Sequence, residues 1–164
     1  MFTIFYGDFK GTYFACVNSC KKTIRFKDPL NARIHPWVLK GGQKVLAYRI
    51  LIAEDEFLIR WSLTEALSQE GYEVLAVENG REAIETGRSS DFDFVITDLI
   101  MPETDGWGVL NFFRQAQPAP RVIVITAHGE DDTERVAKEN GAWAYVKKPY
   151  VIDRIKEILR TPVA

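Results

Sequence analysis

Cysteine and histidine are scarce in this chain, with two of each among its 164 residues. Cys16 and Cys20 are too few for the dense disulfide frameworks of small secreted domains. A zinc site needs two ligands beyond these cysteines, and His35 is the only histidine near them in the sequence. We therefore interpret the cysteines as two reduced thiols rather than as metal ligands.

Long hydrophobic runs are also missing from the sequence. No stretch reaches the length of about 18 apolar residues that a membrane-spanning helix requires. The apolar start of the chain is interrupted by Asp8 and Lys10, and no cleavage-like segment follows, so a secretory signal is not expected. These absences predict a cytoplasmic protein with no membrane partner.

Charge is nearly balanced over the whole chain but not along it. The formal net charge of −2 argues against general nucleic-acid binding. Residues 1–48 hold eight Lys and Arg against two Asp and Glu, whereas residues 49–164 hold 13 against 21. This asymmetry indicates two parts with different roles, an N-terminal extension (residues 1–48) and a domain (residues 49–164).

The N-terminal extension is rich in aromatic and basic residues but has too little periodicity to build a second core. We hypothesise that it is weakly structured, or that translation starts later, near Val38 or Val45, since no Met lies between positions 1 and 101. Detection of peptides from residues 2–37 in the native protein by mass spectrometry would refute the later start.

From residue 49 onward, short apolar runs alternate with segments of helical spacing. The runs predict strands at 49–53, 73–77, 92–97, 121–125 and 143–146, and a helix is expected after each. Parallel neighbours need helical crossovers, and strands that are apolar at every position need cover on both faces. The sequence therefore predicts an α/β fold, a doubly wound five-stranded parallel sheet with helices on both faces.

Polar residues stand at the ends of four of these strands. Asp98 directly follows the third predicted strand, while Glu54-Asp55, Thr126 and Lys148 lie at the ends of the first, fourth and fifth. In open parallel sheets, sites form at the carboxyl ends of the strands, where the winding direction reverses. We therefore expect these side chains to meet at one edge of the sheet.

The three carboxylates in this group need a counter-charge. Two carboxylates about 4 Å apart repel each other by about 4 kcal/mol at an effective dielectric constant of about 20. A hard divalent cation answers this repulsion, and Mg²⁺ prefers carboxylate oxygens and water as ligands. Glu54, Asp55 and Asp98 therefore predict a magnesium site, whereas Glu56 suits the positive end of the first helix dipole.

Lys148 and Thr126 add an ammonium group and a hydroxyl to the same place. The ammonium is a point charge that suits a phosphate or a carboxylate. Together with Asp98 as nucleophile and Mg²⁺, these groups describe phosphoryl transfer onto an aspartate, in which the protein mainly positions groups and neutralises charge. Lys147 should point to the opposite face of its strand, and we interpret it as a solvated lysine.

On these residues, the chain resembles the receiver domain of two-component response regulators, of the stand-alone, single-domain type. The resemblance covers residues 49–164 and none of the N-terminal extension. It implies a flavodoxin-like sheet with strand order 2-1-3-4-5. The matching fragments are Ile50-Leu51-Ile52-Ala53-Glu54-Asp55-Glu56, Thr97-Asp98-Leu99-Ile100-Met101-Pro102, Asp105-Gly106, Val124-Ile125-Thr126-Ala127 and Tyr145-Val146-Lys147-Lys148-Pro149.

The resemblance implies that Asp98 accepts a phosphoryl group from a phosphohistidine on a sensor histidine kinase or a histidine phosphotransfer protein. Glu54, Asp55 and Asp98 would hold Mg²⁺, with the backbone carbonyl of Ile100 as a further ligand. Such a protein is a phosphoacceptor regulator of a phosphorelay and not an enzyme, since it catalyses only its own phosphorylation and dephosphorylation.

Three further residues take roles from the same resemblance. Thr126 would donate a hydrogen bond to the phosphoryl group, and Lys148 would pair with it. Tyr145 occupies the switch-aromatic position, and its ring would turn inward when Thr126 moves toward the phosphate, reshaping the face made by the fourth helix, fifth strand and fifth helix. The peptide bond before Pro149 is typically cis in this family.

The chain departs from the common pattern at three positions. Glu54 replaces the more frequent aspartate, and its longer side chain is expected to reach the metal through water. Ile100 and His128 occupy positions that tune the lifetime of the phosphoryl group in this family. Because an apolar Ile100 cannot orient an attacking water molecule, we expect slow self-dephosphorylation, while the effect of His128 is left open.

The output of the predicted receiver domain is expected to be protein binding. The chain ends at Ala164, just past the fifth predicted helix, and the acidic domain has no basic recognition helix. We therefore expect a downstream protein target or onward relay to a second histidine, no nucleic-acid partner, and dimer formation on phosphorylation as a further option.

Two other chemistries remain as alternatives on the same topology. A flavodoxin-like binder of flavin or nucleotide needs a cradle of Gly, Ser or Thr after the first strand, where this chain has Glu54-Asp55-Glu56-Phe57. A phosphatase or mutase with an aspartyl nucleophile usually carries a second acid two residues later, where this chain has Ile100. Flavin-type absorbance would identify the first.

A third alternative is a receiver-shaped interaction module that is never phosphorylated. The complete set of acids, hydroxyl and lysine argues against it. A spectral shift on adding beryllofluoride, lost in Asp98→Ala, would distinguish a working receiver domain from such a module.

Overall fold

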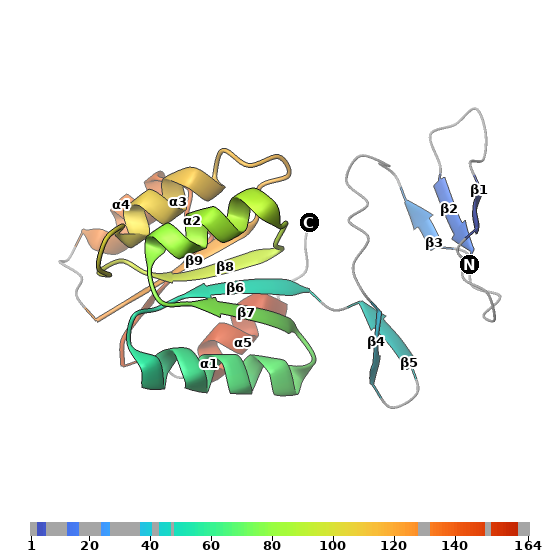
Figure 1. The fold of residues 1–164 in the computed structure, drawn as a ribbon, viewed down its shortest axis with the longest axis horizontal. Helices are drawn as coiled ribbons and strands as arrows, with labels where there is room; N and C mark the ends of the chain where they lie inside the picture. Colours follow the sequence, from blue (N-terminus) through green and yellow to red (C-terminus); the bar gives the residue numbers. More distant parts are fainter. Residues whose placement is uncertain are drawn as a thin grey trace. The chain divides into compact units, whose positions relative to one another are not determined.

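The predicted parallel sheet is present in the computed structural model and positions the candidate site. Its strands are paired in parallel in the order β10-β9-β8-β6-β7, which is 2-1-3-4-5 in the numbering of the sheet alone (Figure 1). This confirms both the fold class and the strand order. The strands are β6 (Arg49–Ala53), β7 (Glu73–Val77), β8 (Phe94–Asp98), β9 (Arg121–Thr126) and β10 (Ala144–Lys147).

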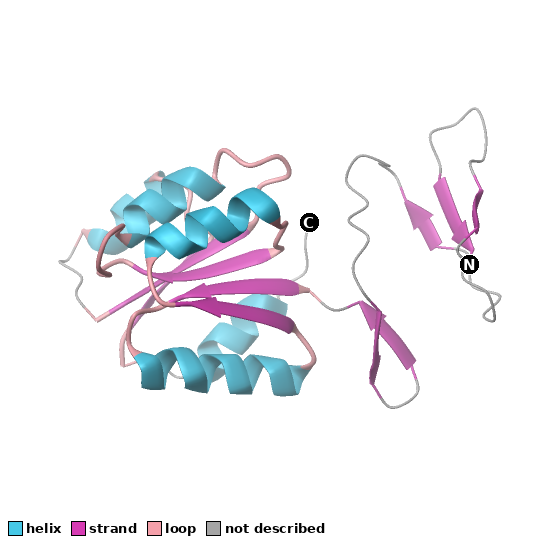
Figure 2. Cartoon of the chain, viewed as in Figure 1, coloured by secondary structure: helices cyan, strands magenta, loops and turns pink. Residues whose placement is uncertain are grey.

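Helices cover both faces of this sheet, as predicted. Helices α1 and α5 lie on one face, and α2, α3 and α4 lie on the other (Figures 1 and 2). This arrangement satisfies strands whose residues are apolar on both sides. The helices are α1 (Phe57–Glu70), α2 (Gly80–Ser89), α3 (Gly106–Phe113), α4 (Thr133–Glu139) and α5 (Ile152–Arg160).

Two hydrophobic cores result, one on each face of the sheet. Alternate residues of β6 divide between them: Ile50 and Ile52 face α1 and α5, whereas Leu51 and Ala53 face α2 and α3. Burying one such large aliphatic side chain stabilises the fold by about 1.5–3 kcal/mol. Since both cores share the same five strands, the ends of those strands are held firmly relative to one another.

Local signals fix the helices that flank the site. The side chain of Asn79 accepts a hydrogen bond from the Glu82 N–H at 2.9 Å and begins α2. Asp105 does the same for α3 by accepting from Gly108 N–H at 2.9 Å. Gly71, with a φ of 95°, ends α1 in the left-handed conformation.

The third strand begins and ends later than its apolar run predicts. The run starts at Phe92, whereas β8 spans Phe94–Asp98 and includes the candidate aspartate as its last residue. Phe92 is buried although it precedes the strand. An apolar run reports burial and not the start of backbone pairing, so strand boundaries are less certain than strand existence.

The first part of the chain contributes shorter strands. The structure describes residues 3–5, 13–16, 24–26, 37–40, 43–46, 48–127, 132–149 and 152–160. The chain divides into two units, Met1–Ile34 and His35–Ala164. The first contains an antiparallel sheet of β1 (Thr3–Phe5), β2 (Tyr13–Cys16) and β3 (Ile24–Phe26), and the second adds the hairpin of β4 (Trp37–Lys40) and β5 (Gln43–Leu46).

The boundary predicted at residue 48 from charge remains a prediction. The division between the two units falls earlier, after Ile34, so that β4 and β5 belong to the larger unit. The side chains of Cys16, Cys20 and His35 lie outside the described part of the chain, so the interpretation of the two cysteines as reduced thiols stays a prediction. Within the residues that the structure describes, no helix is long and apolar enough to cross a membrane.

Candidate functional site

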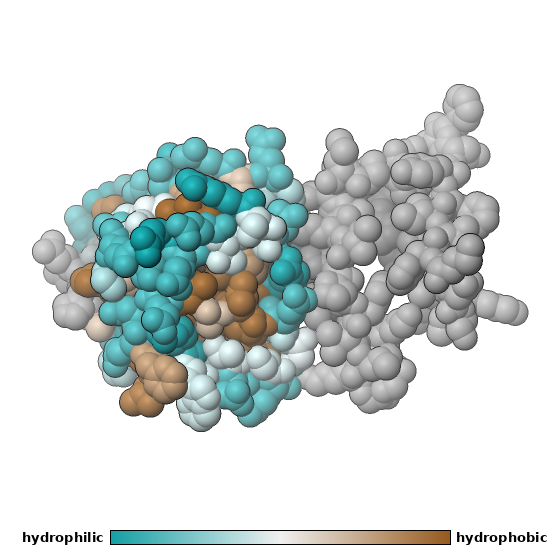
Figure 3. All heavy atoms as spheres, in the orientation of Figure 1, coloured by the Kyte–Doolittle hydropathy of each residue, from teal (hydrophilic) through white to brown (hydrophobic). Residues whose placement is uncertain are grey.

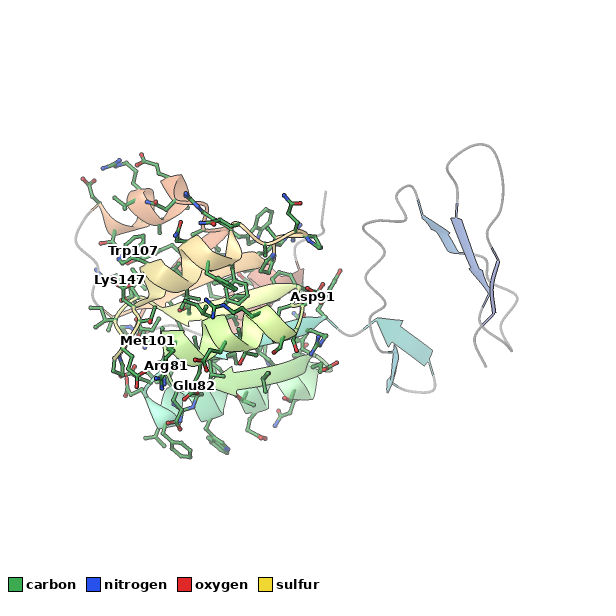
Figure 4. The ribbon with its side chains drawn as sticks, turned by 45° about the horizontal axis from the view of Figure 1, so that its top comes forward. Arg81, Glu82, Asp91, Met101, Trp107 and Lys147 are labelled. Atoms are coloured by element: carbon green, nitrogen blue, oxygen red, sulfur yellow. The ribbon has the colours of Figure 1, made fainter. Side chains whose placement is uncertain are left out.

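Residues far apart in the sequence meet at the carboxyl ends of the parallel strands. Glu54 follows β6, Asp98 ends β8, and Lys148 follows β10. Figure 4 shows this end of the domain: Lys147 and Met101 lie there, whereas Asp91, which precedes β8, lies at the opposite end. The expected convergence at one edge is therefore observed.

Lys148 joins the two buried carboxylates of the site. Its ammonium Nζ donates to Asp98 Oδ2 at 2.6 Å and to Glu54 Oε1 at 3.0 Å, and it lies 2.9 Å from Glu54 Oε2. The Lys148 side chain is 8% exposed, Asp98 is 6% exposed as a residue, and Glu54 is fully buried. Because burial removes hydration from all three charges, their close contacts and hydrogen bonds must offset the cost of desolvation.

The pKa values of Glu54 and Lys148 reflect this environment. Burial is the main influence on Glu54 and raises its pKa above the usual value, against the opposing hydrogen bond and charge of Lys148. Burial also acts first on Lys148, where it lowers the pKa, but hydrogen bonds to Asp98 and Glu54 and their charges outweigh burial and raise the pKa overall. Lys148 is therefore an ammonium group at neutral pH.

The donor set fits a hard divalent cation. One carboxylate oxygen from each of Glu54, Asp55 and Asp98 lies within 4.8 Å of the other two. With all three ionised, Lys148 neutralises one negative charge and leaves about two. Among the described residues, Glu54 Oε2 is a buried side-chain oxygen that accepts no hydrogen bond of acceptable geometry, although Lys148 Nζ is near it. Oxygen ligands, excess negative charge and an unsatisfied buried acceptor together suit Mg²⁺.

The loop after β8 packs tightly against Asp98. The Ile100 N–H donates to Asp98 Oδ1 at 3.1 Å, and the Ile100 side chain is exposed. A Cβ on Gly106 would lie 2.0 Å from the Asp98 carbonyl oxygen, so only glycine permits α3 to begin this close to the strand. The role of the Ile100 carbonyl as a metal ligand remains a prediction.

Of the remaining predicted residues, the structure describes Thr126, Tyr145 and Lys147. Thr126 is fully buried at the end of β9, and its carbonyl accepts from Lys148 N–H at 2.8 Å. Tyr145 is half-buried against the core on the α2–α4 face, and burial raises its pKa above the usual tyrosine value. Lys147 is exposed, as interpreted from its place in the strand. His128 lies outside the described residues. The Lys148–Pro149 peptide bond is cis.

Arg60 belongs to the site although the sequence did not indicate it. Its Nη1 donates to the Glu54 carbonyl at 2.6 Å and to the Asp55 carbonyl at 3.0 Å, while its Nη2 contacts Glu78 Oε1 at 2.8 Å. An arginine in a helix has no sequence signature for bonds to main-chain carbonyls. Only the folded loop reveals its partners.

An exposed apolar patch on α1 was also missed. Phe57, Leu58 and Trp61 are 65%, 72% and 56% exposed, although Leu63 and Leu67 of the same helix are fully buried. Figure 3 shows hydrophobic residues at the surface near the start of α1. The available signal was that α1 carries more apolar residues than one buried face can hold. We call Phe57, Leu58 and Trp61 the α1 patch.

Comparisons with known proteins match most of the second unit to one protein family. The sequence model of the response regulator receiver domain matches residues 50–160. Transcriptional regulatory protein PdtaR of Mycobacterium tuberculosis is 41% identical over 105 residues, covering 63% of this chain and 51% of PdtaR. Sporulation initiation phosphotransferase F of Bacillus subtilis is 34% identical over 112 residues, covering 68% of this chain and 90% of that protein.

A solved structure agrees with these sequence relatives. A response regulator from Burkholderia pseudomallei, described with a phosphorylated aspartic acid, a calcium ion and citrate, matches with a TM-score of 0.64 and 26% identity. The match covers 70% of this chain and 67% of that one. The chain spans about half the length of several curated relatives, 51% of PdtaR and 48% of ResD of Bacillus subtilis.

Proposed function

Because this chain belongs to the response regulator receiver domain family, whose members are phosphoacceptors of two-component phosphorelay signalling, we propose that Asp98 is its phosphoacceptor. The donor is a phosphohistidine on a sensor histidine kinase or a histidine phosphotransfer protein. Transfer depends on Mg²⁺ and switches a protein-binding face of the domain.

One observation carries this proposal. Asp98 is the member of the carboxylate cluster that ends a buried strand at the edge of the sheet, and its Oδ2 makes the shortest contact with Lys148, at 2.6 Å. The neighbouring acids and the ammonium fix the position of the Asp98 carboxylate, which suits one of its oxygens to attack phosphorus. The Glu54 carboxylate is buried deeper and contacts Lys148 as well, which suits a ligand more than an acceptor.

The step requires little covalent work from the protein. An oxygen of the Asp98 carboxylate attacks phosphorus, the phosphorus–nitrogen bond breaks, and its electron pair returns to the imidazole nitrogen of the donor. Mg²⁺ held by Glu54, Asp55, Asp98 and the Ile100 carbonyl would neutralise charge on the phosphoryl oxygens. Lys148 then pairs with the phosphoryl group that Asp98 carries.

The response to phosphorylation involves Thr126 and Tyr145. Thr126, at the end of β9, donates its hydroxyl proton to a phosphoryl oxygen, and Tyr145 of the neighbouring strand turns inward. The face of α4, β10 and α5 changes and binds a downstream protein or a second copy of this chain. Since some relatives are named as transcriptional or DNA-binding regulators, the absence of a nucleic-acid partner stays a prediction.

Acetyl phosphate tests the proposed function without knowledge of the kinase. In the presence of Mg²⁺, we expect the intact mass of the protein to rise by one phosphoryl group. Excess EDTA should prevent this rise, because the carboxylate cluster then repels the anionic donor. An unchanged mass with Mg²⁺, measured on protein shown to be folded by circular dichroism, would contradict the proposal.

The α1 patch supports a protein donor beside the acidic site. It begins two residues after Asp55, and three large exposed apolar side chains on one helix are unusual for a surface that faces only water. We expect Trp61→Ser to lower the rate of phosphotransfer from a cognate kinase by about tenfold or more, since buried tryptophans often dominate interfaces.

Two comparisons make this prediction specific. Phosphorylation of Trp61→Ser by acetyl phosphate should match that of the wild type, because the small donor needs no docking surface. Leu75→Ser removes another exposed apolar side chain, 44% exposed on β7, and should leave both rates unchanged. Equal kinase rates for Trp61→Ser and wild type would exclude the α1 patch as the docking surface.

A further inference from the structure

The loop between β6 and α1 is held from within α1 by Arg60. This residue lies in the first turn of the helix, and its side chain is only 11% exposed. One guanidinium nitrogen, Nη1, donates to the carbonyl oxygens of both Glu54 and Asp55, at 2.6 and 3.0 Å. Two of the three residues whose carboxylates form the cluster are thus bonded through their main chain to the same side chain.

Arg60 is itself fixed on its other side. Its Nη2 donates to Glu78 Oε1 at 2.8 Å, and Glu78 directly follows β7. The Glu54 N–H also bonds the Val77 carbonyl at 3.2 Å, so the loop and the end of β7 are connected twice. A planar guanidinium can hold three acceptors in one plane, which a lysine ammonium cannot do in the same geometry.

We propose that Arg60 is a positioning residue for the cation site. It fixes the backbone of Glu54 and Asp55 and thereby the directions in which their carboxylates leave the loop. The inference rests on the proposed function, because it takes the carboxylate cluster to be a Mg²⁺ site. Side chains that orient metal ligands through hydrogen bonds typically change metal affinity by about 10- to 100-fold when they are removed.

The charge of Arg60 and its hydrogen bonds to the loop have opposite expected effects on Mg²⁺ affinity. A positive group beside the cluster repels Mg²⁺, so its removal by itself should strengthen Mg²⁺ binding. Loss of the hydrogen bonds that fix the loop should weaken Mg²⁺ binding. Arg60→Lys separates the two effects because it keeps the charge and loses the planar fork, whereas Arg60→Met loses both.

Calorimetric titration with Mg²⁺ of the full-length protein tests the inference. We expect Arg60→Lys and Arg60→Met each to raise the Kd for Mg²⁺ by about tenfold or more relative to the wild type. Arg81→Met is the matched control: Arg81 lies at the same end of the domain, is 60% exposed and pairs with Glu103 at 2.9 Å. It loses the same charge and should leave the Kd within about twofold, as expected for a screened surface charge.

Urea unfolding in EDTA accompanies the titration and separates positioning from general stability. Arg60→Lys with wild-type Mg²⁺ affinity would overturn the inference even if its unfolding midpoint fell, because the role would then be structural only. Tighter Mg²⁺ binding by Arg60→Met would overturn it in favour of the charge effect. A wild type that binds no Mg²⁺ would instead overturn the proposed function, which distinguishes the two failures.

Discussion

Asp98→Asn is expected to abolish phosphorylation while leaving the protein folded. The amide has nearly the shape of the carboxylate but no anionic oxygen to attack phosphorus. Incubation of the variant with acetyl phosphate and Mg²⁺, followed by intact-mass measurement, should show no added phosphoryl group when the wild type is fully modified. We expect this to be the largest effect of any single substitution in the chain.

The fold should tolerate this change. The asparagine side chain of the variant retains an oxygen that can accept from Lys148, and the substitution removes one of three clustered negative charges. Asp105→Asn is a matched control, since Asp105 begins α3 and asparagine is an equally good helix cap. Its phosphorylation should equal that of the wild type. A phosphoryl group on Asp98→Asn would place the acceptor elsewhere and contradict the assignment.

The convergence of the site could be predicted from the sequence because it follows from topology. Glu54 and Lys148 are 94 positions apart, yet Lys148 Nζ lies 3.0 Å from Glu54 Oε1. Parallel strands connected by helices must all point their carboxyl ends to one edge. Strand assignment alone predicts that the polar residues at the strand ends share one edge, and the strand order then decides which of them meet.

The α1 patch could not be predicted in the same way. Leu63 and Leu67 are four positions apart, as residues on one face of a helix are, and both are fully buried. Helical spacing does not show that Phe57, Leu58 and Trp61 face water, because an apolar residue in a helix of mixed pattern can belong to either face. Exposure depends on what the sheet and α5 leave uncovered, which is a property of the assembled layers.

Arg60 illustrates a second limit. Its partners are two main-chain carbonyls and the Glu78 carboxylate, and none of these is marked in the sequence as an acceptor. Backbone carbonyls of a loop become available only when the loop leaves the regular pairing of the sheet. Sequence patterns identify side chains suited to chemistry more readily than the groups that position them.

The largest expected effect on stability is that of Lys148→Met. The ammonium is the counter-charge of the buried Glu54 and Asp98 carboxylates. Methionine keeps much of the side-chain volume but leaves both carboxylates without a counter-charge. Removing one partner of a buried ion pair typically lowers the free energy of unfolding by about 3–5 kcal/mol. Urea unfolding in EDTA should show this loss, whereas Lys147→Met, at an exposed neighbour, should stay within about 0.5 kcal/mol of the wild type.

Mg²⁺ should restore part of the stability lost in Lys148→Met. Without the ammonium, the cluster carries about one more negative charge, so the cation binds the folded state more tightly and stabilises it more, while the unfolded chain offers no such site. We therefore expect saturating Mg²⁺ to raise the free energy of unfolding more in Lys148→Met than in the wild type. If Mg²⁺ stabilised both proteins equally, Lys148 and the cation would not share the same carboxylates, and the electrostatic account of the site would be wrong.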